Sequence, residues 1–166
     1  MTPFEHHIRI LSQHQQIFLN SCCASGMEMI LKLHDKMLPD LHEIQERYKG
    51  QHDSVGFGKL ADLEPHVHAS DSHLQFADFF RETTAEAQAG RFPIFSTRIT
   101  YPHPQGGEFL GPHHVFVCIW DGSRVHYISR SLDGYLIAFQ DLHQFVAKLR
   151  VLDSSISSFH TVRYTC

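Results

Sequence analysis

Apolar residues recur at helical spacing in the segment that follows position 19. Residues 20–36 read NSCCASGMEMILKLHDK, with one apolar stripe of Cys22, Gly26, Met29, Ile30 and Leu33 and a second of Met27 and Leu31. Two stripes predict a helix that is buried on more than one face. Asn20 and Ser21 are both favourable N-cap residues, so the helix is expected to begin at Cys22 or Cys23, with a thiol at its N-terminus.

The pattern changes from helical to strand-like near residue 91. Before that point, LHEIQERY predicts a short polar helix, and residues 74–89 predict a longer one that Gly90 would end. Residues 60–72, between them, fit neither pattern. After that point, runs rich in Val, Ile, Phe and Tyr predict four strands, FPIFSTRITY, HVFVCIW, RVHYIS and GYLIAF. The Asp121-Gly122 pair predicts a hairpin between the second and third of these strands.

The end of the chain adds a predicted helix over residues 141–150 and a last strand over residues 159–164. Helices therefore come first and strands second, an order that favours an α+β fold with an antiparallel sheet over alternating βαβ units. No repeat, low-complexity tract or linker divides the 166 residues, so a single domain over residues 1–166 is expected. Hydrophobic residues make up 42% of the chain, which is enough to form a core.

Charge and cysteine content narrow the classes of partner and compartment. Lys and Arg number 14 against 18 Asp and Glu, and a net charge of -4 argues against binding nucleic acid or an anionic membrane surface. No apolar run is long enough to span a bilayer, and residues 1–9 do not resemble a secretory signal. Cys22, Cys23, Cys118 and Cys166 do not form a disulfide pattern, so a reducing, cytoplasmic location is expected. Delivery elsewhere by a dedicated secretion system stays open.

The candidate chemistry centres on Cys22, because a helix N-terminus favours the thiolate form of a cysteine. Gln16 precedes Cys22 by six residues, and the neighbours His113 and His114 begin a predicted strand directly after the loop 106–112. The Gly-rich residues 105–111 are read as a flexible loop beside the histidine. A Gln, a Cys and a His in this chain order are the parts of a cysteine peptidase. The alternative is that Cys22 and Cys23 are small residues that pack a helix end.

Three segments resemble papain-like cysteine peptidases, in particular the bacteriocin-processing group that cleaves double-glycine leader peptides. QIFLNSCCASGMEMILKLHDK resembles the nucleophile segment of this group, AQAGRFPIFSTRI resembles its Gly-Arg-Pro strand segment, and HHVFVCIWDGSRVHYIS resembles its histidine hairpin. The resemblance extends from about residue 16 to residue 129. It implies a papain-like fold in which a helical half that carries the cysteine packs on a C-terminal sheet.

The resemblance also implies a role for each site residue. Cys22 takes the nucleophile position, His113 the base, and Gln16 the oxyanion donor, together with the backbone N–H of Cys22. Ser129 falls where the family has Asp or Asn, and Cys23 falls where it usually has Gly. His114 is the alternative base, because neighbours in a strand point to opposite faces, and Asp133 is the alternative third residue.

These residues predict a thiol hydrolase that acts on a peptide or protein substrate and needs no metal or organic cofactor. Peptidase, amidase and acyltransferase chemistry all fit, and the oligomeric state stays open. The alternative function is a papain-like binding module with weakened or lost catalysis, since a serine orients an imidazole poorly. His66 and His68, with His73 or His103, lack the spacing typical of a zinc site and are expected to be solvated loop residues.

Overall fold

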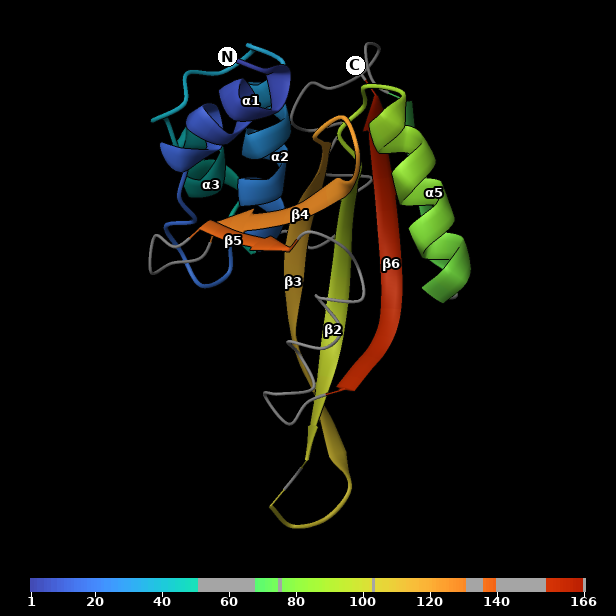
Figure 1. Ribbon diagram of the computed structural model, residues 1–166. Coiled ribbons are helices and arrows are strands. Elements are labelled where there is room, and N and C mark those ends of the chain that lie inside the picture. The colour runs from blue at the N-terminus through green and yellow to red at the C-terminus, as the bar shows by residue number, and fades with distance from the viewer. Residues whose placement is uncertain (51–67, 75, 103, 131–135, 140–154, 166) are drawn as a thin grey trace.

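A computed structural model describes residues 1–50, 68–74, 76–102, 104–130, 136–139 and 155–165. The strands form a six-stranded antiparallel sheet in the order β1-β6-β2-β3-β4-β5. Helices α1, α2 and α3 gather on one side of it and α5 lies on the other (Figure 1). The elements in chain order are α1 (Pro3–Ser12), α2 (Cys22–Leu33), α3 (Glu43–Tyr48), β1 (His68–Leu74), α5 (Phe76–Gln88), β2 (Ile94–Pro102), β3 (Glu108–Trp120), β4 (Val125–Arg130), β5 (Leu136–Phe139) and β6 (Ser155–Thr165).

The predicted α+β class is therefore confirmed. The predicted helices around residues 22–33, 41–48 and 74–89 correspond to α2, α3 and α5, and the four predicted strands to β2, β3, β4 and β5. Gly90 has a φ of 83°, the left-handed conformation of a residue that ends a helix. The predicted helix over residues 141–150 lies outside the described residues. In the described parts of the chain, no helix has both the length and the apolar character needed to cross a membrane.

Two predicted loops are instead strands. β3 begins at Glu108, so residues 108–110 of the segment read as a flexible loop pair with β2, and the turn is confined to the residues around 104–107. His68 and His73 belong to β1, which pairs with β6, while His66 and His103 lie outside the described residues. In both places a partner strand supplies the backbone hydrogen bonds, and single-sequence patterns carry no information about that partner.

Helix α1 was not predicted, although its start carries a recognisable signal. Thr2 and Glu5 form a capping box, in which each side chain accepts a hydrogen bond from the other residue's backbone N–H, and Pro3 begins the helix. Phe4 and Ile8, one turn apart, pack against the core. The helix therefore covers part of the core from the same side as α2.

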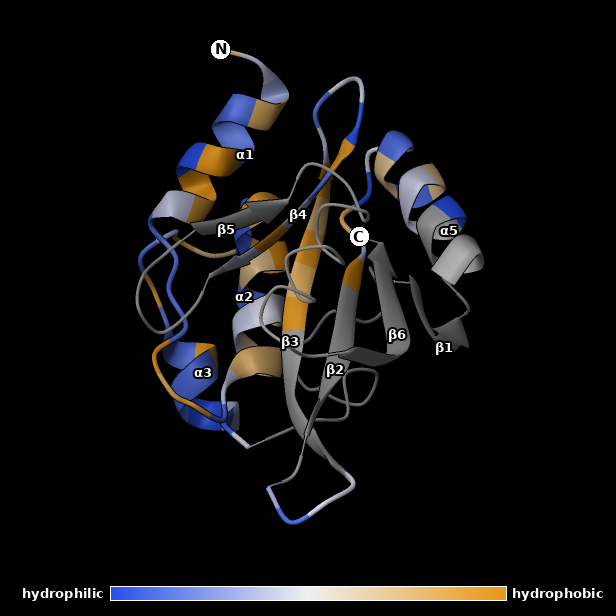
Figure 2. Cartoon of the chain, turned by 60° about the horizontal axis from the view of Figure 1, so that its bottom comes forward, coloured by the Kyte–Doolittle hydropathy of each residue, from blue (hydrophilic) through white to orange (hydrophobic). Residues whose placement is uncertain are grey.

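Helix α2 forms the centre of the core, and every residue from Cys23 to Leu33 is buried. Val115, Val117 and Ile119, alternate residues of β3, pack in the same cluster as α2. Gly26 is the point of close approach: a Cβ at this position would lie 2.8 Å from Val115 Cγ1 and 3.1 Å from Ile94 Cδ1. The absence of a side chain therefore allows the α2 backbone to lie directly on the sheet. Figure 2 shows the apolar strip of β3 beside α2.

The predicted hairpin at Asp121-Gly122 joins β3 and β4, with Trp120 paired to Val125 and a φ of 105° at Gly122. The Asp121 carboxylate accepts hydrogen bonds from the backbone N–H groups of Ser123 (2.7 Å) and Arg124 (2.8 Å) and lies 2.7 Å from His126 Nε2. Burial raises the pKa of this carboxyl group, but the hydrogen bonds lower it by more, so its pKa lies well below the usual value.

We expect Asp121→Asn to lower the free energy of unfolding by about 1 kcal/mol at pH 7, because hydrogen bonds to the carboxylate are lost. A depressed carboxyl pKa stabilises the folded state above the unfolded-state pKa of about 4, and this stabilisation is lost as the pH falls below it. The difference between the variant and the wild type should therefore shrink from pH 7 to pH 3 in urea unfolding curves. An equal difference at both pH values would contradict this role of Asp121.

Candidate active site

Cys22 is the first residue of α2, as predicted, and its partly buried side chain packs against the core cluster. Ser21 is the N-cap residue, but its side chain does not cap the helix. Its hydroxyl lies 2.8 Å from Gln45 Oε1 and 3.0 Å from the Phe18 carbonyl oxygen. The residue before the cysteine is thus held by contacts outside its own helix.

Strand position 113 lies on the side of β3 that faces α2. The β2–β3 register pairs Arg98 with His113 and Thr97 with His114 and continues without interruption to Val117. Since Val115 and Val117 pack with α2, alternation assigns position 113 to that face and position 114 to the opposite one. Of the two candidate bases, the register favours His113.

Cys22 and strand position 113 lie on the same side of the contact between Gly26 and Val115, along α2 and β3 respectively. The C-cap of α2, His34, contacts the ring of Phe92 just before β2, so α2 runs in the direction of β3 (Figure 2). From the Gly26–Val115 contact, four helical residues back to Cys22 cover about 6 Å, and two strand residues back to position 113 cover about 6.6 Å. The N-terminus of α2 therefore lies toward the same end of β3 as the strand position of the predicted base.

Gln16 lies half-buried in the segment between α1 and α2. Its Nε2 donates a hydrogen bond of 2.7 Å to the carbonyl oxygen of Phe18. An amide nitrogen carries two protons, so this contact leaves a second N–H for an oxyanion. Gln16 and Cys22 thus belong to one short segment, in which a local hydrogen bond orients the Gln16 amide.

Ser129 lies on the other side of the sheet. Ile128 pairs with Val117 and packs in the core beneath α2, so alternation along β4 assigns Ser129 to the opposite face. The structure does not bring Ser129 to the face that carries Cys22. Asp133, the alternative third residue, lies outside the described residues.

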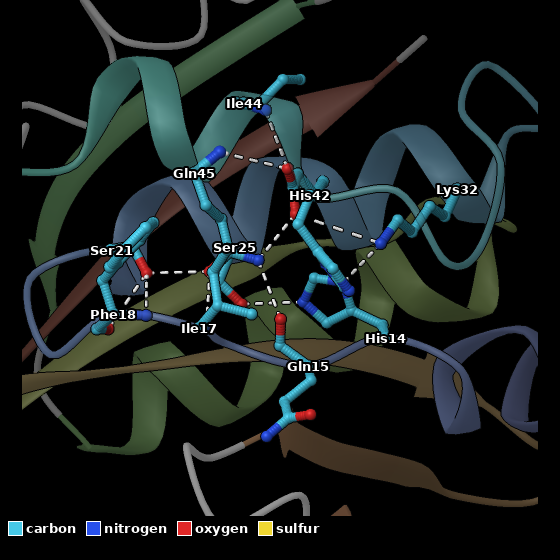
Figure 3. Close-up of polar contacts among 11 residues, drawn as sticks. His14, Gln15, Ile17, Phe18, Ser21, Ser25, Lys32, His42, Ile44 and Gln45 are labelled. Carbon is cyan, nitrogen blue, oxygen red and sulfur yellow. Dashed lines mark hydrogen bonds and ion pairs between the residues drawn. The ribbon is translucent and has the colours of Figure 1, made fainter.

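A buried polar network, which we call the Glu28 network, joins α2, α3 and the segment before Cys22 (Figure 3). Glu28 is fully buried, and its Oε2 accepts hydrogen bonds from the backbone N–H groups of Ile44 (3.0 Å) and Gln45 (3.1 Å). His42, the N-cap residue of α3, makes no side-chain cap. Glu28 therefore caps α3 from the neighbouring helix and places a negative charge at its N-terminus.

Lys32 supplies a positive charge within the Glu28 network. Its ammonium group lies 2.7 Å from His14 Nδ1 and 4.0 Å from Glu28 Oε1, and its side chain is buried. Burial lowers the pKa of Lys32 to about 8, against the opposing effects of Glu28 and Asp40. His14 Nδ1 accepts from this ammonium group, so Nε2 carries the imidazole proton and donates to Ser25 Oγ at 2.8 Å.

The same network contains a set of side chains that could hold a metal ion. Ligand atoms of His14, Glu28 and His42 lie within 4.8 Å of one another, and His42 Nδ1 is buried without a hydrogen-bond partner. The ammonium group of Lys32, however, already lies against His14 Nδ1. A divalent ion would have to displace this charge, so the network is better described as an internal ion pair.

The sequence prediction did not include the Glu28 network. Its signal was a charged pair, Glu28 and Lys32, one turn apart in a helix whose two apolar stripes predict burial on several faces. Comparison with known proteins adds no further assignment: no protein-family model matches the chain, and no curated protein is significantly similar to it.

Proposed function

We propose that the protein is a papain-like cysteine hydrolase, with Cys22 as nucleophile, His113 as base and Gln16 as oxyanion donor. The observation that supports the proposal is the position of Cys22 at the N-terminus of α2, on the face of β3 to which the register assigns position 113 and toward the same end of that strand. A papain-like fold requires this arrangement, in which a helix carries the cysteine at its N-terminus and a strand of an antiparallel sheet carries the histidine. The thiol must stay reduced to react, which fits a cytoplasmic location.

In the proposed reaction, His113 takes the proton of the Cys22 thiol, and the thiolate attacks the carbonyl carbon of a peptide or amide. An S–C bond forms, and the carbonyl electron pair moves to the oxygen, which the Gln16 amide and the Cys22 backbone N–H stabilise. The C–N bond then breaks, and His113 gives its proton to the leaving amine. Water, or an amine acceptor, takes the acyl group and restores the thiol.

The pH dependence of Cys22 alkylation by iodoacetamide tests the proposed pair, in a Cys23→Ala/Cys166→Ser background. Cys118 is fully buried and its burial raises its thiol pKa, so it does not interfere. We expect a Cys22 pKa well below the reference of about 8.5, because a helix N-terminus and an imidazolium both stabilise the thiolate. His113→Ala should raise this pKa by at least one unit.

His114→Ala is the matched control, since the adjacent strand position belongs to the opposite face and its loss should leave the Cys22 pKa unchanged. A Cys22 pKa near 8.5 that responds to neither substitution would contradict the proposal. A response to His114→Ala alone would move the base to position 114 and contradict the register argument.

A binding module on the same fold is the second candidate function. One observation favours it: Ser129 lies on the sheet face away from α2. A site without a carboxylate or amide partner for its histidine would keep the fold and lose turnover. Turnover, seen by mass spectrometry as an acyl group that forms on Cys22 and is then released with return of the free thiol, would exclude this second function.

A further inference from the structure

Gln45 of α3 uses the full hydrogen-bonding capacity of its side-chain amide. Its Nε2 donates to the Gln15 carbonyl oxygen at 2.8 Å and to Glu28 Oε1 at 2.7 Å. Its Oε1 accepts from the Ile17 backbone N–H at 2.9 Å and from the Ser21 hydroxyl at 2.8 Å. The residue is fully buried, so no water competes for these contacts.

Three of these four partners flank the proposed reactive groups. Gln15 and Ile17 are the two neighbours of Gln16, and Ser21 immediately precedes Cys22 (Figure 3). The fourth partner, Glu28, belongs to α2, the helix that begins with Cys22. One amide group therefore joins the backbone on both sides of the oxyanion donor to the helix that carries the nucleophile.

The end of α3 adds further contacts to the same segment. The Gly50 backbone N–H donates to the Asn20 carbonyl oxygen at 2.7 Å, and the Lys49 ammonium group lies 4.5 Å from the centre of the Phe18 ring. These contacts are closer to the surface, and Leu19 between them is 88% exposed. Gln45 is thus the buried contact of α3 with this segment, whereas the contacts at the end of α3 lie nearer the surface.

We propose that Gln45 is a positioning residue that fixes Gln16 relative to Cys22, an inference that rests on the proposed function. Rate acceleration by an oxyanion donor depends on its geometry, and a displacement of about 1 Å can cost about a hundredfold in rate. The segment 13–21 has no regular secondary structure beyond turns, so its backbone does not fix Gln16 by itself. Gln45 supplies that constraint from α3, and Glu28 in turn holds α3.

Two reagents that react with the same thiol distinguish the position of the oxyanion donor from the reactivity of the thiolate. 4-Nitrophenyl acetate acylates Cys22: an S–C bond forms, the C–O bond breaks, and 4-nitrophenolate leaves with the electron pair after an oxyanion intermediate. Iodoacetamide alkylates Cys22 by direct displacement of iodide and forms no oxyanion. The ratio of the two rate constants therefore reports the oxyanion donor, while the alkylation rate alone reports the thiolate.

We expect Gln16→Ala and Gln45→Met each to lower the acylation-to-alkylation ratio by between about tenfold and a hundredfold. The alkylation rate should stay within about twofold in both variants, in the Cys23→Ala/Cys166→Ser background. Glu46→Gln, at an exposed position of the same helix, is the matched control and should keep the wild-type ratio. Circular dichroism spectra of each variant establish that it is folded.

A wild-type ratio in folded Gln45→Met, with a lowered ratio in Gln16→Ala, would overturn the role of Gln45 and leave the proposed function intact. An equal ratio in the wild type and Gln16→Ala would instead overturn the oxyanion role of Gln16, and the positioning role with it. Should Gln45→Met not fold, Ser21→Ala removes one partner of Gln45 Oε1 and should lower the ratio at least threefold; an unchanged ratio there would overturn the inference.

Discussion

Replacing Glu28 by leucine is expected to lower the free energy of unfolding by about 3–5 kcal/mol, the usual cost of removing one partner of a buried ion pair. The substitution leaves the Lys32 ammonium group buried without its carboxylate. It also removes the acceptor of the Ile44 and Gln45 backbone N–H groups, so α3 loses the side chain that caps it. Urea unfolding followed by circular dichroism measures the loss, and Glu46→Leu on the exposed side of α3 is the control.

The Glu28→Leu/Lys32→Met double variant tests the cause of that loss. If the stranded charge is responsible, removal of both charges should cost at least about 2 kcal/mol less than the sum of the two single losses. Losses that simply add would mean that the two side chains stabilise the protein independently. In that case the ion pair would not be the organising contact of the Glu28 network.

Replacing Gly26 by valine should cost about 3 kcal/mol, because its Cβ would overlap Val115 Cγ1 and crowd Ile94 Cδ1. Val115 is a β-branched side chain on a central strand, and its stiffness at χ1 limits how far it can move out of the contact. The helix must then move away from the sheet, which opens the core between α2 and β3. A thermal unfolding curve measures the loss as a lower melting temperature.

A smaller substitution at the same position provides the control, because its effect on stability should change sign between two backgrounds. Alanine is a better helix former than glycine by about 1 kcal/mol, yet Gly26→Ala should destabilise the wild type because of the overlap. In a Val115→Ala background the overlapping methyl is gone, and the same substitution should stabilise the protein. Stabilisation in both backgrounds would show that the close approach of α2 to β3 imposes no steric limit.

Local patterns were sufficient to predict much of the fold. The two apolar stripes and the Asn20-Ser21 pair predicted the beginning and the burial of α2, and the Asp121-Gly122 pair predicted the hairpin between β3 and β4. Each of these signals depends on residues that are close together in the sequence. The same holds for Gly90, whose positive φ follows the last turn of α5.

Features that depend on distant partners were not predicted. The extension of β3 back to Glu108 requires β2, and the strand β1 requires β6, from the other end of the chain. The face of Ser129 depends on the register between β3 and β4, in which a shift by one residue exchanges the two sides of the sheet. For the candidate site, the sequence proposed Cys22, Gln16 and His113, but not the side chains that surround them.

Gln45 shows why those side chains were missed. In the sequence it is one polar residue of a short polar helix, and nothing nearby distinguishes it from the exposed Glu46. Its four partners lie 17 to 30 residues away. Only the packing of α3 against α2 brings them together.

The Glu28 network also limits how this protein can change over evolutionary time. Glu28, Lys32 and His14 compensate one another's buried polarity, so a substitution at one position is expected to lower the stability of the fold until a second position changes. Such positions are expected to change together in a lineage, whereas exposed neighbours such as Glu46 drift singly. Paired replacement at positions 28 and 32 in related sequences would therefore be evidence for the network that does not depend on a structure.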